Sequence, residues 1–341
     1  MPKVSIQIVT WNSMRYIFDC LESLMRQTFR DFSILVIDNG SDDGTVGFIR
    51  ANYPTVSVLQ NFRNLGFAKA NNQGILLSKS EYVLVVNPDV ILTEDFLRQL
   101  VDFAQKHPGG GSFGGKILKI YREAPESFGE EAALGEIIKS DVIDSAGLEI
   151  YKSRQVIDRG EGKKDEGQYD RSEEVFGVSG AGVLYRKAAL SDTMIKNESF
   201  DQDFFAYKED IDLAWRLRLY GWESWYAPLA VCYHHRKMAR PGGLKKTIKQ
   251  RRNSSLKLRL LSFRNQRLML VKNDFGANLF FHLPRFLFRE MKIILYSLFF
   301  ERFQLKGLIQ SFQLLPAMLI KRRVIMAHRK VSAKEMRRWF R

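Results

Sequence analysis

Cysteine is scarce in this 341-residue chain, which contains only Cys20 and Cys232, each among apolar neighbours. Two such residues build neither a disulfide framework nor a Cys-based zinc site. The first 90 residues also lack the Gly-x-Gly-x-x-Gly fingerprint of dinucleotide-binding proteins and the Gly-x4-Gly-Lys-Ser/Thr phosphate loop. Residues 1–6 lack the long apolar core of a signal peptide, so the sequence predicts a cytoplasmic location.

Acidic residues almost disappear after residue 235. Residues 236–341 hold 27 Lys and Arg against four Asp and Glu, a net charge of +23, which leaves −8 for residues 1–235. We therefore expect a catalytic domain at 1–235, with halves at about 1–105 and 106–235, and a basic extension at 236–341. Such a charge predicts a polyanionic partner, either a nucleic acid or an anionic membrane surface. Long aliphatic stretches among the basic residues favour the membrane surface over nucleic acid.

Residues 279–300 are more apolar than the basic stretch before them, but they contain Arg285, Arg289, Glu290 and Lys292. Each central charge costs about 2.5–3.5 kcal/mol on insertion scales, which argues against a membrane-spanning helix. Positions 279, 283, 286, 287, 294, 295 and 298 share a helical phase, so the segment is expected to be an interfacial helix or a buried packing helix. Upstream, residues 245–267 predict a basic helix.

The first 90 residues alternate strand and helix patterns. Strands are expected at 4–9, 32–37, 56–59 and 82–86, with helical spacing between them. This alternation predicts an α/β fold with a doubly wound parallel sheet. The run 82–86 has no polar alternation, as expected for a strand buried on both faces, and Pro88 ends it.

Asp89 follows this strand directly. Ligands of open α/β sheets bind beyond the carboxyl ends of the strands, so Asp89 is expected in the site. A bound diphosphate needs a counter-charge, because both common phosphate cradles are missing from these first 90 residues. A divalent cation at Asp89, either Mg or Mn, is the economical choice, since hard oxygen ligands suit both ions.

Several motifs together resemble family 2 glycosyltransferases of the GT-A fold, and most of all the rhamnosyltransferase-like branch. They are Thr10-Trp11-Asn12 and the stretches 36–44, 64–68 and 86–89, which occur in the family's order. The resemblance covers roughly residues 3–270. It implies a nucleotide-sugar site at Thr10, Asn12, Asp38, Asn39, Asn64, Gly66, Phe67, Asn87, Gly180 and Ala181.

The resemblance also makes Asp89 the metal-binding end of the family's Asp-x-Asp motif. Asn87 replaces the first Asp of that motif, which lowers the charge around the cation. Asn39 stands where many relatives carry a base-reading Asp, and its amide can pair with either uracil or thymine.

Glu209 and Asp210 precede a helical pattern that begins at Ile211. Acidic residues at such a position complement the helix dipole, which is a purely structural role. The resemblance to the family's Glu-Asp motif implies a catalytic base, with Asp210 as the first choice and Glu209 as the alternative. The resemblance also implies that His234 reaches the metal or the diphosphate, with His235 as the fallback.

Taken together, the resemblance implies an inverting, metal-dependent glycosyltransferase. The expected donor is a dTDP- or UDP-linked sugar such as rhamnose, and the expected acceptor is a hydroxyl of a polysaccharide or lipid-linked glycan at the inner face of the cell membrane. A homo-oligomer is left open. A sugar-nucleotide pyrophosphorylase is the enzymatic alternative, although Thr10–Arg15 lacks that class's glycine-rich loop. A nucleic-acid-binding protein is the non-enzymatic one.

Overall fold

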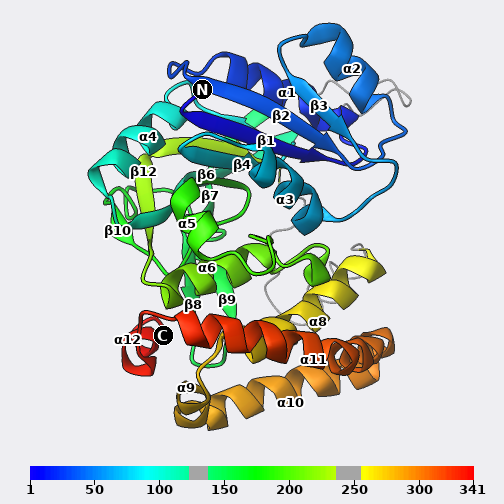
Figure 1. Cartoon of the computed structure of the whole chain (residues 1–341), viewed down its shortest axis with the longest axis vertical. Coiled ribbons are helices and arrows are strands. Elements are labelled where there is room, and N and C mark those ends of the chain that lie inside the picture. Colours follow the sequence, from blue (N-terminus) through cyan, green and yellow to red (C-terminus); the bar gives the residue numbers. More distant parts are fainter. Residues whose placement is uncertain (123–136, 236–254) are drawn as a thin grey trace.

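The computed structural model describes residues 1–122, 137–235 and 255–341 (Figure 1). Its first part alternates strands and helices as predicted: β1 (Val4–Thr10), α1 (Met14–Met25), β2 (Phe32–Asp38), α2 (Thr45–Asn52), β3 (Ser57–Gln60), α3 (Phe67–Leu77) and β4 (Tyr82–Val86). Strand β1 pairs in parallel with both β2 and β4, and β2 pairs in parallel with β3. The predicted α/β class with a parallel half-sheet at the start of the chain is confirmed.

The sheet then becomes mixed. The following elements are β5 (Val90–Leu92), α4 (Phe96–Lys106), β6 (Gly110–Arg122), β7 (Ile137–Ser145), β8 (Leu148–Ile150), β9 (Val156–Asp158), β10 (Glu173–Glu174), β11 (Gly182–Arg186), α5 (Lys187–Asp192), a 3-10 turn at Gln202–Phe204, α6 (Glu209–Leu219) and β12 (Glu223–His234). Strand β11 lies antiparallel between β4 and β6, and β12 runs parallel to β6. The sheet therefore changes direction beside the end of β4, where a ligand site is expected.

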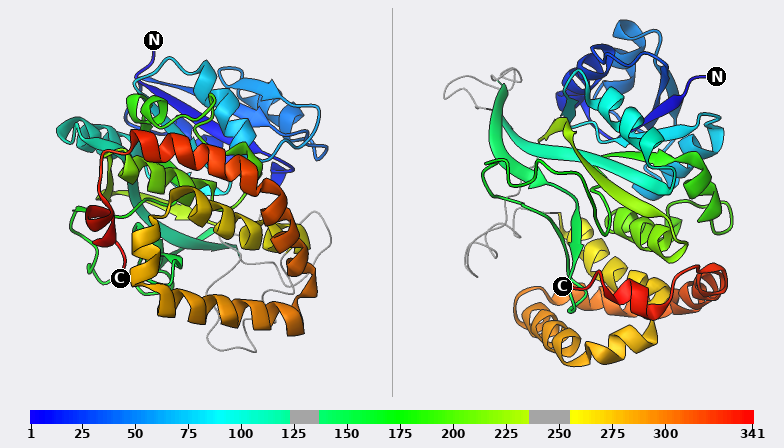
Figure 2. Two further views of the ribbon diagram at one scale, coloured as in Figure 1. Left: turned by 60° about the horizontal axis from the view of Figure 1, so that its bottom comes forward. Right: turned by 90° about the vertical axis from the view of Figure 1, so that its left-hand side faces the viewer.

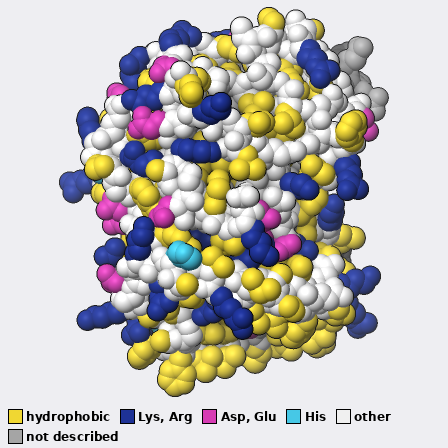
Figure 3. Space-filling view, in the orientation of Figure 1, with side chains coloured by type: hydrophobic (Ala, Val, Ile, Leu, Met, Phe, Trp, Pro, Cys, Tyr) yellow, Lys and Arg dark blue, Asp and Glu magenta, His cyan; other side chains and the backbone are white. Residues whose placement is uncertain are grey.

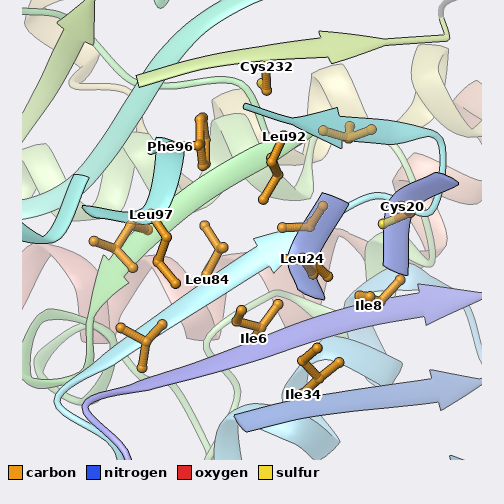
Figure 4. Close-up of a cluster of buried hydrophobic side chains, with 14 of the residues drawn as sticks. Ile6, Ile8, Cys20, Leu24, Ile34, Leu84, Leu92, Phe96, Leu97 and Cys232 are labelled. Carbon is orange, nitrogen blue, oxygen red and sulfur yellow. The ribbon is translucent and has the colours of Figure 1, made fainter. Parts of the chain in front are cut away.

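Strand β4 shows why its sequence lacks polar alternation. Leu84 and Val86 face a core formed with α1 and α4, including Leu24, Phe96 and Leu97 (Figure 4). Val83 and Val85 face the opposite side of the sheet, where α3, α5 and α6 pack. Because helices cover both faces, each position of the strand is buried and apolar side chains are required throughout.

The rest of the chain is helical: α8 (Leu256–Asn273), α9 (Gly276–Phe281), α10 (Leu283–Phe300), a 3-10 turn at Arg302–Gln304, α11 (Leu305–His328) and α12 (Ala333–Arg337). The segment 279–300 is not one continuous helix, since it breaks at His282, and Pro284 lies in the first turn of α10, where its missing N–H does no harm. Of the predicted basic helix at 245–267, residues 245–254 lie outside the described residues, and α8 begins at Leu256.

Helices α8 and α11 lie beside each other below α6, and α10 lies farthest from the sheet (Figures 1 and 2). Met269 of α8 and Ile325 of α11 share a core with Trp215 of α6. Phe340, next to the C-terminal residue, completes this core, with its ring centroid 5.9 Å from that of Trp215. The helices after residue 255 therefore belong to the same packed body as the sheet. None of the helices within the described ranges has both the length and the apolar content to cross a bilayer.

Candidate active site

Three segments meet beyond the carboxyl end of β4: residues 87–89, the pair Gly180-Ala181 before β11, and the first turn of α6. The backbone N–H of Asn87 donates to the carbonyl of Ala181 at 2.9 Å. The N–H of Gly180 donates to Oδ2 of Asp210 at 3.3 Å. The residues expected near the metal and those expected to provide the base are therefore linked through two consecutive residues of the chain.

Gly180 packs directly against Asp210. A Cβ atom at position 180 would lie 3.0 Å from the Cβ of Asp210 and 3.1 Å from its Oδ2. A side chain at 180 would therefore require the side chain of Asp210 to shift by a few tenths of an ångström. Glycine lets the backbone approach this carboxylate closely.

The two carboxylates at the start of α6 have different surroundings. Glu209 is 7% exposed, and its Oε2 accepts no hydrogen bond from the part of the chain that the structure describes. Burial, together with the charge of Asp210, raises the pKa of Glu209 to about 8. Asp210 is half-buried, and burial also raises its pKa, with a smaller contribution from Asp158. A raised pKa makes either carboxylate a stronger base, and of the two it is Asp210 that accepts from Gly180, the residue before Ala181.

The segment before these carboxylates is held in an unusual conformation. Phe205, Tyr207 and Lys208 have φ angles of 65°, 71° and 74°, a left-handed region that costs free energy for residues other than glycine. The side-chain amide of Asn265 in α8 donates to the carbonyls of Phe204, Ala206 and Tyr207 at 2.8–3.0 Å. Sequence patterns gave no indication of this role, because Asn265 follows the base by 55 residues in an ordinary helix.

The same segment touches the loop that begins α3. Gly66 has a φ of 87°, and a Cβ there would lie 2.6 Å from the carbonyl oxygen of Phe205. The N–H of Ala68 donates to that oxygen at 3.2 Å, and the side chain of Asn64 accepts from the N–H of Gly66 at 2.9 Å. Asn64, Gly66 and Phe67 therefore lie against the segment that leads to the base.

The loops after β1 and β2 are joined by a buried carboxylate. Asp38 and Thr10 are fully buried, and Oδ1 of Asp38 accepts from the hydroxyl of Thr10 at 2.8 Å. Oδ2 of Asp38 accepts from the backbone N–H groups of Gly40 and Ser41. Asn12, with a φ of 52°, is exposed and bonds to the 41–42 turn. Thr10 and Asp38 hold these loops together through a buried contact, whereas Asn12 lies at the surface.

Asn39 lies between these two regions. It is 2% exposed, and its side chain donates to the carbonyl of Gly66 at 3.3 Å and accepts from the side chain of Asn61 at 3.1 Å. These two bonds use one N–H and one lone pair of the amide, which has two of each.

Asp89 and His234 face each other across the end of the sheet. Nε2 of His234 lies 3.4 Å from Oδ1 of Asp89, and Nδ1 lies 2.9 Å from Oδ2 of the buried Asp144. Burial disfavours the charged imidazole, but hydrogen bonds to both carboxylates raise the pKa of His234 to about 9. His235 donates its backbone N–H to the carbonyl of Asp89, and its ring packs on Tyr16 instead. Of the two histidines, His234 is the one whose side chain faces Asp89.

These residues fit a divalent cation held by few protein ligands. Within the described ranges, no three His, Cys, Asp or Glu side chains form a complete metal-binding group. Mg and Mn sites in enzymes that bind phosphates often use only one or two carboxylates plus the substrate's oxygens. Oδ1 of Asp89 and Nε2 of His234 converge, and Asp144 fixes the imidazole by the histidine–carboxylate contact typical of metal sites.

A family model for glycosyl transferase family 2 matches residues 5–193, which is more than half of the chain. The chain belongs to this family. The matched range contains the sheet apart from β12, together with the Gly180-Ala181 pair, Asp89 and Asp144, whereas Asp210 and His234 lie beyond it. A family 2 glycosyltransferase is a transferase, so the enzyme class expected from the sequence is confirmed.

Curated relatives of this family 2 glycosyltransferase include an N-acetylglucosaminyl-diphospho-decaprenol L-rhamnosyltransferase of Mycobacterium tuberculosis, 29% identical over 67% of this chain and 74% of the relative. Another is a poly-beta-1,6-N-acetyl-D-glucosamine synthase of Staphylococcus epidermidis, 25% identical over 67% of this chain and 49% of the relative. The resemblance to a rhamnosyltransferase-like branch inferred from the sequence agrees with the first of them.

Solved structures support the GT-A fold. S. aureus TarS 1–349 in complex with UDP-GlcNAc matches 99% of this chain and 92% of its own, with 18% identity and a TM-score of 0.55. GalNAc-T7 with UDP, GalNAc and Mn2+ matches 80% of this chain and 48% of its own, with 13% identity and a TM-score of 0.56. At these identities the likeness concerns the fold alone.

Proposed function

We propose that this family 2 glycosyltransferase moves a sugar, with inversion, from a nucleoside-diphosphate donor to a hydroxyl of a lipid-linked glycan. The observation that carries the proposal is the link from Asp210 through Gly180 and Ala181 to Asn87. It places a carboxylate of raised pKa beside the strand end that carries Asp89. Asp210 would accept the proton of the acceptor hydroxyl. Asp89 would help to hold the cation that balances the charge of the donor's diphosphate.

In this mechanism Asp210 removes the proton from the acceptor hydroxyl as that oxygen attacks the anomeric carbon. The bond from that carbon to the diphosphate breaks on the opposite face, so the configuration inverts. The N–H of Gly180 holds Oδ2 of Asp210 in place, and burial strengthens this carboxylate as a base. Asp89 and His234 would hold a divalent cation, Mg or Mn, which neutralises the charge of the leaving diphosphate.

The donor would be a UDP- or dTDP-linked sugar such as rhamnose. Support comes from the mycobacterial relative, which is named as a rhamnosyltransferase acting on a diphospho-decaprenol-linked sugar. The loops that hold Asn12, Asn39 and Gly66 form one connected network next to the base-bearing segment, which suits a nucleoside on one side and a sugar on the other.

A membrane surface would bring this enzyme to such an acceptor. Large apolar side chains on the outermost helices face the solvent: Phe280 is 75% exposed, Phe299 is 73% and Phe312 is 70%. Figure 3 shows hydrophobic side chains gathered along the edge formed by α9 and α10, with Lys and Arg side chains nearby. Apolar area of this kind inserts into the interface, while basic residues add about 1 kcal/mol each near anionic lipids.

A panel of nucleotide sugars tests the chemistry. We expect one UDP- or dTDP-linked sugar to be consumed in the presence of Mg or Mn, with release of the nucleoside diphosphate, and consumption to cease when Asp89 is replaced by Ala. Product analysis by mass spectrometry and NMR would show transfer and the anomeric configuration. Retained configuration, or full activity of Asp89→Ala, contradicts the proposal.

Sedimentation with vesicles tests the membrane surface. Phe299→Glu and Phe312→Glu should reduce binding to anionic phosphatidylglycerol vesicles, whereas Phe62→Glu, a change at a fully exposed residue between β3 and α3, should not. Equal binding of all variants would contradict the proposal.

A further inference from the structure

A basic pocket lies between α10 and the turn that joins β8 to β9. Its volume is about 440 Å³, and five cationic side chains line it: Lys152, Arg285, Arg289, Lys292 and Arg341. None of its lining residues is acidic. A volume of this size is within the range of small-molecule sites, and the charge selects for an anion.

Most of these cations lack a carboxylate partner. Arg289 pairs with Glu290 at 2.9 Å, and Arg341 pairs with Glu149. Across residues 1–122, 137–235 and 255–341, no salt bridge involves Lys152, Arg285 or Lys292, although the ammonium of Lys292 lies 4.1 Å from the ring of Phe288. At least three positive charges therefore remain available to a ligand.

The pKa of the neighbouring His282 reflects the positive potential around this pocket. Burial, and then the charges of Arg154, Lys152, Arg337 and Arg285, lower the pKa of His282 to about 4. Its Nδ1 lies 2.8 Å from a guanidinium nitrogen of Arg154, consistent with a neutral imidazole that accepts a hydrogen bond.

The walls of the pocket are fixed by the fold. The N–H of Lys152 donates to the carbonyl of Arg341 at 2.8 Å, and the N–H of Arg341 donates to the carbonyl of Ile150 at 3.0 Å. Arg154 is fully buried and also bonds to Asp274 at 2.8 Å, which ties the β8–β9 turn to the α8–α9 junction. The cations are therefore held on a rigid support before any ligand binds.

An apolar stripe begins at the pocket and follows α10. Phe288 lines the pocket, and Met291, Leu295, Leu298 and Phe299 follow at helical spacing, each at least 42% exposed. From Phe288 to Phe299 the stripe extends about 16 Å at the rise of an α-helix. A ligand with an anionic head and a long apolar chain would match both parts.

The pocket is also electrostatically linked to the catalytic segment. Burial, chiefly, lowers the pKa of Lys208, and the positive charge of Arg289 lowers it further, against the opposing charges of Asp210, Asp158 and Glu209. Lys208 directly precedes Glu209 and Asp210. Arg289 is therefore near enough to the base for its charge to act on the same short segment.

We infer that this pocket binds the phosphate or diphosphate headgroup of the amphiphilic acceptor, with the apolar chain lying along the α10 stripe. The inference rests on the proposed transfer to a lipid-linked acceptor, which it refines by assigning the residues that hold the lipid's anionic head.

Calorimetry with three probes tests the pocket. Farnesyl diphosphate, inorganic pyrophosphate and farnesol are titrated into the full chain with UDP and Mg held at saturation, so that the donor site is filled. We expect farnesyl diphosphate to bind most tightly, because it has both the anionic head and the chain. The double change Arg285→Ala with Lys292→Ala should weaken its binding about 30-fold. Arg302→Ala with Lys306→Ala removes the same charge outside the pocket and should change binding less than about twofold.

The double change Phe288→Ser with Met291→Ser distinguishes binding of the apolar chain from binding of the anionic head. This variant should weaken the binding of farnesyl diphosphate and leave the binding of pyrophosphate unchanged. Equal affinities for farnesyl diphosphate and pyrophosphate would overturn the lipid assignment in favour of a free phosphate. If the pocket variant and the control variant weaken the binding of farnesyl diphosphate equally, the pocket is not the binding site.

The two proposals fail differently. If the enzyme consumes a nucleotide sugar but binds none of the probes, the proposed function stands and the inference about the pocket is wrong. If the enzyme binds farnesyl diphosphate through Arg285 and Lys292 but consumes no nucleotide sugar, the assignment of the pocket stands and the proposed function is wrong.

Discussion

Nδ1 of His234 lies 2.9 Å from Oδ2 of Asp144, a residue 90 positions earlier in the chain. Asp144 is fully buried, so its carboxylate has this imidazole as a main partner in place of water. The contact leaves Nε2 of His234 facing Asp89. A histidine that is oriented by a buried carboxylate presents its other nitrogen in a fixed direction, which suits a metal ligand.

Asp144→Asn should therefore weaken cation binding about 10- to 100-fold, the usual effect of removing such a partner. Titration of Mn into enzyme with UDP would measure the change. Asp141→Asn on the same strand is the control, because Asp141 pairs with Lys164 at the surface. Unchanged Mn affinity in Asp144→Asn would show that His234 does not bind the cation.

Asp210→Asn should lower kcat about 10²- to 10⁴-fold, the usual contribution of a general base. Affinity for the donor should stay nearly the same, because the amide keeps the shape and the Oδ contact with Gly180. Glu209→Gln is the comparison. If Glu209→Gln is severely impaired and Asp210→Asn is nearly active, then Glu209 is the base.

The pH profile should report the surroundings of Asp210. The base must be deprotonated to act, so kcat/KM rises as pH increases through its pKa, and the raised pKa moves this rise above the range of an ordinary aspartate. Asp158 contributes to the raised pKa through its negative charge. Asp158→Asn should therefore shift the acid limb to lower pH, and an unmoved limb would mean that another group controls it.

Glu209 should make stability depend on pH. Its folded-state pKa, about 8, lies above the ordinary value of 4.5, so its contribution is fully present below about pH 4.5 and is lost as pH rises through 8. Glu209→Gln removes the titrating group. The melting temperature of this variant relative to the unmodified protein should increase between pH 5 and pH 9, and a constant difference across this range would contradict the raised pKa.

Asn265→Ala should lower kcat with a smaller effect on donor KM, because its amide holds the three carbonyls of the segment that leads to the base. The lost hydrogen bonds should destabilise the protein by about 1–3 kcal/mol. Asn278→Ala is a matched control, since Asn278 is also a buried amide in the C-terminal helices but bonds to Ala333 and Arg337. A similar loss of stability with unchanged kcat is expected for this control, and the same result for Asn265→Ala would make its role purely structural.

Removing the whole C-terminal extension is a less informative test than these substitutions. Lys321 of α11 is buried against Asp201, and Phe340 packs on Trp215 of α6. A deletion from residue 276 would expose this core and leave buried carboxylates without their lysine partner, so the loss of donor binding could follow from unfolding alone.

Local sequence determined the parallel half-sheet and the strand end that carries Asp89. A run of apolar residues such as Tyr82–Val86 has few stable arrangements other than a covered strand, and Pro88 ends it wherever the fold places it. The small pair Gly180-Ala181 and the acidic start of α6 were also visible in the sequence, but their place in the site was implied by the resemblance to the family.

Only the tertiary structure decided which distant groups complete the site. Asp144 meets His234 because β7 pairs with β6, which also pairs with β12, and Asn265 meets the catalytic segment because α8 packs against α6. The burial of Thr10 and Asp38 depends on the pairing of β1 with β2. The helical spacing of the apolar residues in α10 fits a buried helix as well as a surface helix. The sequence therefore did not decide whether this apolar face is exposed. Such contacts join residues tens of positions apart, and no local pattern specifies them because their energy arises only when the chain is folded.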